Sequence, residues 1–172
     1  MQKIIKQFPV LSQYTYVNTA TSGLLYDDLL DWRQEHDLDF LIGGSSMKMK
    51  GHLLLSETRN TIGEFFGCKA DNVALVPNFS IGLNLLLEGM GSARNVLLLE
   101  GDYPSLNWPF ESRDCHTFYI KVTEALEENI YDRIRLDNIN VLALSLVQWL
   151  NGIKVDLEFL VKFAGDQLPG RV

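Results

Sequence analysis

Apolar residues recur at helical spacing in the first part of the chain. Residues 27–42 and 51–66 carry apolar side chains three and four positions apart, the pattern of an amphipathic helix. Gly43 and Gly67 follow these segments, and glycine is a common residue just after a helix. Residues 14–19 have the composition of a strand and run into a turn of small residues. We therefore expect one strand and two helices in this part.

From Val73 onward, short apolar segments alternate with helical ones. We expect strands at residues 73–76, 95–99, 116–122 and 141–147, and helices from residue 80, near residue 105, at residues 123–130 and from residue 156. The segments 96–99 and 141–146 are apolar throughout, which indicates that both faces of these strands are covered. The predicted fold class is α/β, a partial three-layer α/β/α sandwich with a mostly parallel sheet. Ligands are expected at the carboxyl ends of its strands.

The chain shows no internal boundary. No repeat, low-complexity tract or linker divides its 172 residues, which predicts a single unit. Within this unit, residues 1–70 form an N-terminal segment with helices, residues 71–160 carry the sheet, and residues 161–172 form a divergent tail.

Composition narrows the classes of function. The formal net charge of −7 argues against nucleic acid as a partner. The apolar runs are too short to cross a bilayer and the N-terminus lacks a signal-peptide pattern, so we expect a cytoplasmic protein without a membrane partner. Cys68 and Cys115 form no C-x-x-C pair, and the histidines lack metal-ligand spacing. We therefore predict reduced thiols and no metal site.

Three expected strand ends carry groups that can bind a ligand. Ser80 begins a helix whose free N–H groups and dipole can hold a phosphate, with plain capping as the alternative. Tyr103 can stack on a flat ring, or can lie half-buried beside a helix start. Gln148 offers an amide to a ligand edge, although Asn151 and Gly152 after it also suit a simple turn. Together, these groups indicate a pocket for a phosphorylated, planar, heteroaromatic ligand.

The same segments resemble, in order, the landmarks of class V aminotransferases. They are residues 16–20, 78–84, 102–105, 145–152 and 156–158. These aminotransferases are fold-type-I enzymes that depend on pyridoxal 5′-phosphate (PLP), and they include cysteine desulfurases, isopenicillin-epimerase-like proteins and kynureninases. The resemblance extends over about residues 8–160. It implies a transferase or lyase that acts on an amino acid, with residues 71–160 as an incomplete PLP-binding large domain, and assembly into a homodimer or larger oligomer.

The resemblance also implies a role for individual residues. The backbone of Phe79 and the hydroxyl of Ser80 would hold the phosphate of PLP. Tyr103 would stack on the pyridine ring, and Gln148 would reach the phenolic oxygen of that ring.

The substrate side and the catalytic groups match the family less well. Asn18 and Thr21 would lie on the substrate side. After residues 156–158, the family continues into a strand with an Asp that pairs with the pyridine nitrogen and a turn with the Schiff-base Lys, whereas this chain ends with residues 165–172. We therefore assign no catalytic residue and expect an N-terminal fragment that is inactive alone. The alternative is a non-catalytic binding or assembly module that uses the same half-fold.

Overall fold

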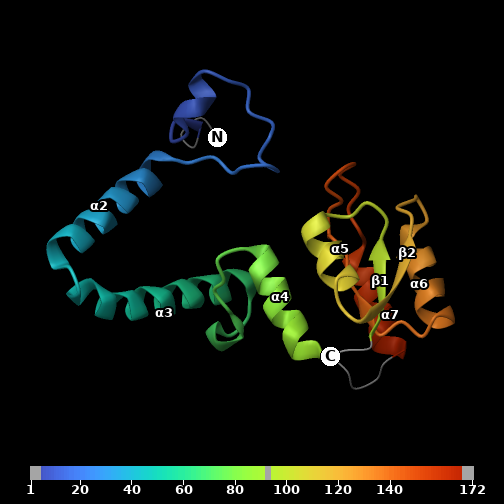
Figure 1. Ribbon diagram of the computed structural model, residues 1–172. Helices are drawn as coiled ribbons and strands as arrows, with labels where there is room; N and C mark the ends of the chain where they lie inside the picture. Colours follow the sequence, from blue (N-terminus) through green and yellow to red (C-terminus); the bar gives the residue numbers. More distant parts are fainter. Residues whose placement is uncertain (1–4, 92–93, 168–172) are drawn as a thin grey trace. The chain divides into compact units, whose positions relative to one another are not determined.

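The computed structural model describes residues 5–91 and 94–167, of which residues 163–167 are described by their backbone alone. The chain divides into two compact units, Met1–Leu75 and Val76–Val172. Helices make up the first unit, and a sheet with helices makes up the second (Figure 1).

The first unit consists of helices and the segments that join them. Its elements are η1 (Pro9–Ser12), α2 (Asp27–Gly43), α3 (Ser46–Phe66) and η2 (Ala70–Asn72). Asp27 and Asp28 lie in the first turn of α2, where the helix dipole favours negative charge. Gly67 ends α3 in the left-handed conformation, with φ of 69°. Both helices expected from the apolar spacing are confirmed, although α3 begins at Ser46 rather than at Gly51.

The strand expected at residues 14–19 is wrong. This segment has no regular secondary structure, and most of its side chains are exposed. The hydroxyl of Tyr16 donates to the carbonyl oxygen of Ser22 (2.9 Å) instead. The strand expected at residues 73–76 is also wrong, because this segment has no strand neighbour among the described residues. Strand-like composition alone does not make a strand, which depends on packing and pairing with a neighbour.

The second unit contains a small parallel sheet. Its elements are α4 (Phe79–Met90), β1 (Arg94–Leu99), α5 (Pro104–Glu111), β2 (Cys115–Ile120), α6 (Leu126–Leu136), β3 (Val141–Leu142) and α7 (Leu157–Gln167). The strand order is β2-β1-β3 and both pairs are parallel, so that Leu97 lies opposite Phe118 on one side and Leu142 on the other. The predicted α/β class with a parallel sheet is thereby confirmed.

The third strand is much shorter than residues 141–147, the range expected for it. After β3, the N–H of Ser145 donates to the carboxylate of Asp102 (2.8 Å). Val147 forms an isolated antiparallel bridge with Lys154. Because the backbone groups of these residues find partners outside β1, the parallel pairing ends early and the chain turns back on itself.

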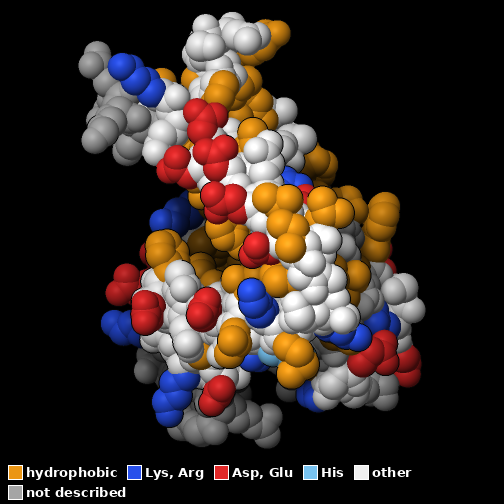
Figure 2. All heavy atoms as spheres, turned by 90° about the vertical axis from the view of Figure 1, so that its left-hand side faces the viewer, with side chains coloured by type: hydrophobic (Ala, Val, Ile, Leu, Met, Phe, Trp, Pro, Cys, Tyr) orange, Lys and Arg blue, Asp and Glu red, His pale blue; other side chains and the backbone are white. Residues whose placement is uncertain are grey.

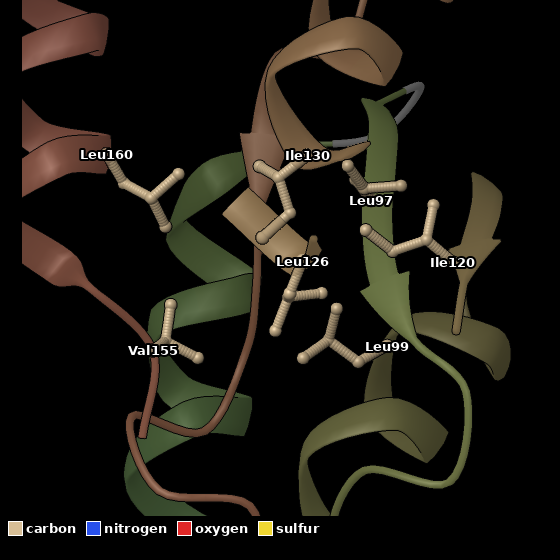
Figure 3. Close-up of a cluster of buried hydrophobic side chains, with 7 residues drawn as sticks. All are labelled: Leu97, Leu99, Ile120, Leu126, Ile130, Val155 and Leu160. Atoms are coloured by element: carbon tan, nitrogen blue, oxygen red, sulfur yellow. The ribbon is translucent and has the colours of Figure 1, made fainter. Parts of the chain in front are cut away.

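Helices cover both faces of β1. Four consecutive residues of this strand are fully buried, namely Val96, Leu97, Leu98 and Leu99. Leu97 and Leu99 pack with residues of α6 and α7, and Figure 3 shows this cluster. Val96 and Leu98 point to the opposite face and pack with residues of α4 and α5. The alternation follows from the pleat of the strand, and it confirms the cover on both faces that the apolar segment predicted.

Large apolar side chains also lie on the surface. Figure 2 shows them on the visible face of the molecule, between acidic and basic side chains. In α2 and α3, the mostly exposed ones include Leu41, Ile42, Met49, Leu53, Phe65 and Phe66. Met47 is the one large apolar side chain that is buried in the described part of the first unit. As far as the chain is described, none of its helices has the length and apolar character needed to cross a membrane.

Candidate functional site

A buried carboxylate, Asp102, lies at the carboxyl end of β1. Gly101 precedes it with φ of 72°, a conformation that favours glycine, and the N–H of Asp102 donates to the carbonyl oxygen of Leu99 (3.2 Å). The Asp102 side chain is buried, with an exposed fraction of 3% for the residue. Its Oδ1 accepts from the N–H of Tyr103 (2.7 Å) and its Oδ2 from the N–H of Ser145 (2.8 Å). The carboxylate therefore joins the end of β1 to the segment that follows β3.

Tyr103 and Gln148, the two residues proposed to contact the ring of the ligand, meet around Asp102. Gln148 is buried, and its Nε2 donates to the carbonyl oxygen of Ser145 (2.8 Å) and more weakly to Oδ2 of Asp102 (3.4 Å). The ring of Tyr103 is half-exposed and lies at 78° to the ring of Trp149, with 5.9 Å between the ring centroids. The structure thus brings these two strand ends together into one polar and aromatic cluster.

The residues proposed to bind phosphate lie at the start of α4. Asn78 caps this helix, because its Oδ1 accepts from the N–H of Ile81 (3.0 Å). Ser80 is therefore not the N-cap, as the sequence suggested, but lies in the first turn. Among the described residues, no acceptor is bonded to the backbone N–H of Phe79 or Ser80. These groups remain free to bind an anion, which the helix dipole also favours.

The phosphate and ring residues do not share a hollow. A hollow of about 340 Å³ along α4 is lined by Ser80, Ile81, Asn84, Leu85 and Glu88. The carboxylate of Glu88 is ion-paired with Arg113 (2.9 Å). Gln148 lines a different hollow of about 290 Å³, together with the exposed Lys121. Ser80 and Gln148 therefore line different hollows of this unit.

The proposed substrate-side residues, Asn18 and Thr21, belong to the first unit. The hydroxyl of Thr21 donates to Oδ1 of Asn18 (2.8 Å), and the N–H of Thr21 donates to the carbonyl oxygen of Asn18 (3.1 Å). Both residues are exposed. They form a polar turn whose groups bond to one another.

A larger hollow, of about 530 Å³, lies at the carboxyl ends of β1 and β2 next to α5. Tyr119 and Glu111 both line it, and the hydroxyl of Tyr119 donates to the carboxylate of Glu111. Burial, followed by this hydrogen bond and the charge of Glu111, raises the pKa of Tyr119 to about 12. The phenol therefore stays neutral near neutral pH and keeps its role as a donor.

We expect Tyr119 to ionise at a higher pH than an ordinary tyrosine. Because its raised pKa belongs to the folded state, the neutral phenol contributes stability that is fully present below pH of about 10, the ordinary pKa of tyrosine. This contribution is lost as the pH rises through about 12. A titration of phenolate absorbance should show one late step in the wild type, which Tyr119→Phe removes and Glu111→Gln moves to lower pH. A late step that persists in Tyr119→Phe would contradict the assignment.

Sequence reasoning gave no role to three residues that line this hollow, Asp102, Asn107 and Trp149, although residues 102–105 and 145–152 carry the family resemblance. Asp102 follows an apolar strand and a glycine, so the expectation that ligands gather at the ends of parallel strands could have selected it. Trp149 is the neighbour of Gln148, but only the amide of Gln148 was assigned a role in this segment. Asn107 lies within α5, and no local pattern marks it.

Comparison with known proteins adds no relative. No protein-family model matches the sequence, and no curated protein is significantly similar to it. No solved structure matches the fold significantly. Within the described residues, no group of three or more His, Cys, Asp or Glu side chains is arranged to hold a metal ion.

Proposed function

We propose that the second unit binds PLP reversibly, as part of a PLP-dependent enzyme that acts on an amino acid. The observation that carries this proposal is the cluster at the carboxyl ends of β1 and β3, where Tyr103 and Gln148 meet around Asp102. In α/β sheets, the carboxyl ends of parallel strands are the usual place for such ligands. The resemblance to class V aminotransferases selects PLP among planar phosphorylated ligands.

The side chains and backbone groups of the second unit fit the chemical parts of PLP. The N–H groups of Phe79 and Ser80 and the hydroxyl of Ser80 are phosphate donors at a helix N-terminus. The ring of Tyr103 is 46% exposed and is not covered by a parallel neighbour, which leaves it able to stack on a pyridine ring. The amide of Gln148 is oriented by its bond to Ser145 (2.8 Å), and a ligand oxygen would replace its weaker bond to Oδ2 of Asp102 (3.4 Å).

The role of the chain in this function is binding and orientation. PLP supplies an electron sink for amino-acid chemistry when it is bound. Asp102 accepts from the Tyr103 N–H and the Gln148 amide and so positions both residues. Because Ser80 and Gln148 line separate hollows, we expect weak and reversible binding.

Ser80→Ala should weaken the binding of PLP by about 1–2 kcal/mol, because a charge-assisted hydrogen bond to the phosphate is lost. Binding can be followed by the quenching of tryptophan fluorescence as PLP is added to the full chain. Pyridoxal, which lacks the phosphate, is the matched control ligand. Ser80→Ala should leave the affinity for pyridoxal unchanged, whereas Tyr103→Ala should weaken the binding of both ligands.

The reversibility of PLP binding gives a second test, whose opposite outcome would contradict the proposal. After desalting, the chain should keep no yellow adduct, and borohydride should fix no pyridoxyl group to it. A stable adduct that borohydride fixes to one lysine would contradict reversible binding. Lys121→Arg then tests whether Lys121, which lines a hollow with Gln148, is the lysine that reacts.

A non-catalytic assembly module remains the second candidate. The observation that favours it is the sheet itself, because the outer edges of β2 and β3 have no strand neighbour among the described residues. Exposed strand edges readily pair with other chains, as the expected homo-oligomer would require. Association of the chain together with no measurable affinity for PLP would favour this candidate.

A further inference from the structure

The hollow of about 530 Å³ beside α5 has an aromatic lining drawn from three parts of the second unit. Trp108 comes from α5, Tyr119 from β2, and Trp149 from the turn after β3. The indole N–H of Trp149 donates to the carbonyl oxygen of Gly101 (2.9 Å), which holds this ring over the end of β1. Trp108 is 65% exposed, so its ring is open to a ligand. Aromatic faces on several sides of a hollow attract cations through their π electrons.

The charged groups of the same hollow are all acidic. Glu100, Asp102 and Glu111 line it, and no Lys, Arg or His is among its lining residues. The carboxylate of Asp102 already accepts hydrogen bonds from two backbone N–H groups, and that of Glu111 accepts one from the Tyr119 hydroxyl. Glu100 is exposed and keeps its carboxylate open to solvent. The lining thus offers negative charge without a compensating cation.

A buried amide, that of Asn107, lies in the wall of the hollow beside the end of β1. Asn107 lines the hollow and is 6% exposed. Its Nδ2 donates to the carbonyl oxygen of Leu99 (3.0 Å), whereas its Oδ1 is buried and receives no hydrogen bond from the described residues. A buried acceptor that lacks a donor costs free energy. The amide ties α5 to the end of β1 and so holds this wall of the hollow in place.

We propose that this hollow binds a small organic cation, an ammonium group carried on an apolar body. The faces of the aromatic rings would contact the apolar body and the cation. The carboxylates, above all that of the exposed Glu100, would accept from its N–H groups. The proposal goes beyond PLP binding and does not depend on it, because the phosphate of PLP carries the opposite charge and its proposed donors lie in α4.

The test is a titration of the full chain with three probes of similar shape: phenethylammonium, 2-phenylethanol and phenylacetate. The indole N–H signals of the three tryptophans in ¹H–¹⁵N spectra report binding, and Trp32 in the first unit is the internal control. Phenethylammonium should shift the signals of Trp108 and Trp149 but not that of Trp32. Its affinity should exceed that of the neutral alcohol by about two- to fivefold, the range of a cation–π contact, and phenylacetate should bind most weakly.

Matched variants assign the preference to the hollow. Glu111→Gln keeps an acceptor for the Tyr119 hydroxyl but removes the charge, so it should lower the affinity for phenethylammonium and leave that for 2-phenylethanol unchanged. Glu128→Gln, an exposed position in α6 outside the hollow, should change neither. Equal affinities for the three probes, or a preference that survives Glu111→Gln, would overturn the proposal. PLP binding through Ser80 is measured separately, so the failure of one proposal leaves the other standing.

Discussion

Replacing Leu97 with alanine is expected to lower the free energy of unfolding of the second unit by about 3–5 kcal/mol. Leu97 has no exposed surface and packs in the cluster that joins β1 to α6 and α7. Removing its side chain beyond Cβ loses the transfer free energy of the buried atoms and leaves a cavity that the neighbouring side chains cannot fill. Urea unfolding of the Leu97→Ala variant, in a Trp32→Phe background that reports on the second unit, measures the loss.

Leu136→Ala is the matched control for this substitution. Leu136 has the same chemistry at the end of α6, but it is 77% exposed, so its removal should change the stability by no more than about 0.5 kcal/mol. If Leu97→Ala were as stable as Leu136→Ala, the burial of this face of β1 under α6 and α7 would be wrong.

Asp102→Ala should destabilise the second unit by about 2–4 kcal/mol, because buried N–H donors lose a charged acceptor. The donors are the backbone groups of Tyr103 and Ser145 and the amide of Gln148. The amide of Ser145 should exchange its hydrogen with solvent much faster in the variant, since this bond holds the segment after β3 against the end of β1. Affinity for PLP should fall as well, because Tyr103 and Gln148 lose their common anchor.

Two further variants distinguish the effect of losing these hydrogen bonds from the effect of removing any negative charge. Asp102→Asn keeps the shape of the side chain but turns an amide N–H₂ toward donors, so it should also be destabilising. Asp132→Ala removes an exposed carboxylate from α6 and should have little effect. Unchanged hydrogen exchange at Ser145 in Asp102→Ala would show that this bond does not form.

The elements that the sequence predicted well are those whose pattern depends on nearby residues. Helix spacing located α2 and α3, and the continuous apolar run at β1 predicted a strand covered on both faces. The predictions that failed, at residues 14–19 and 73–76 and along most of residues 141–147, concern strands without a continuous partner. Whether a neighbour is present depends on residues far along the chain, which local composition does not encode.

The residues of the candidate site divide in the same way, into those that a local pattern marks and those that depend on distant residues. Tyr103 and Gln148 could be selected because they follow apolar strands. Asp102 owes its place to a donor 43 positions later, the N–H of Ser145, and this pairing is invisible in a sequence window. Asn78 rather than Ser80 caps α4, because either residue type suits a cap and only the backbone conformation decides between them.

The strand order β2-β1-β3 affects synthesis of the chain, because the central strand is made first. Both neighbours of β1 come later, and Asn140, which bonds to Asn95 beside β3, lies 45 positions further along. At a translation rate of about 5–20 residues per second, β1 leaves the ribosome roughly two to nine seconds before its last partner does. Until β2 emerges both edges of β1 are unpaired, and until β3 emerges one edge stays unpaired. A nascent chain paused between β2 and β3 would therefore be an especially good substrate for a chaperone that binds extended apolar segments.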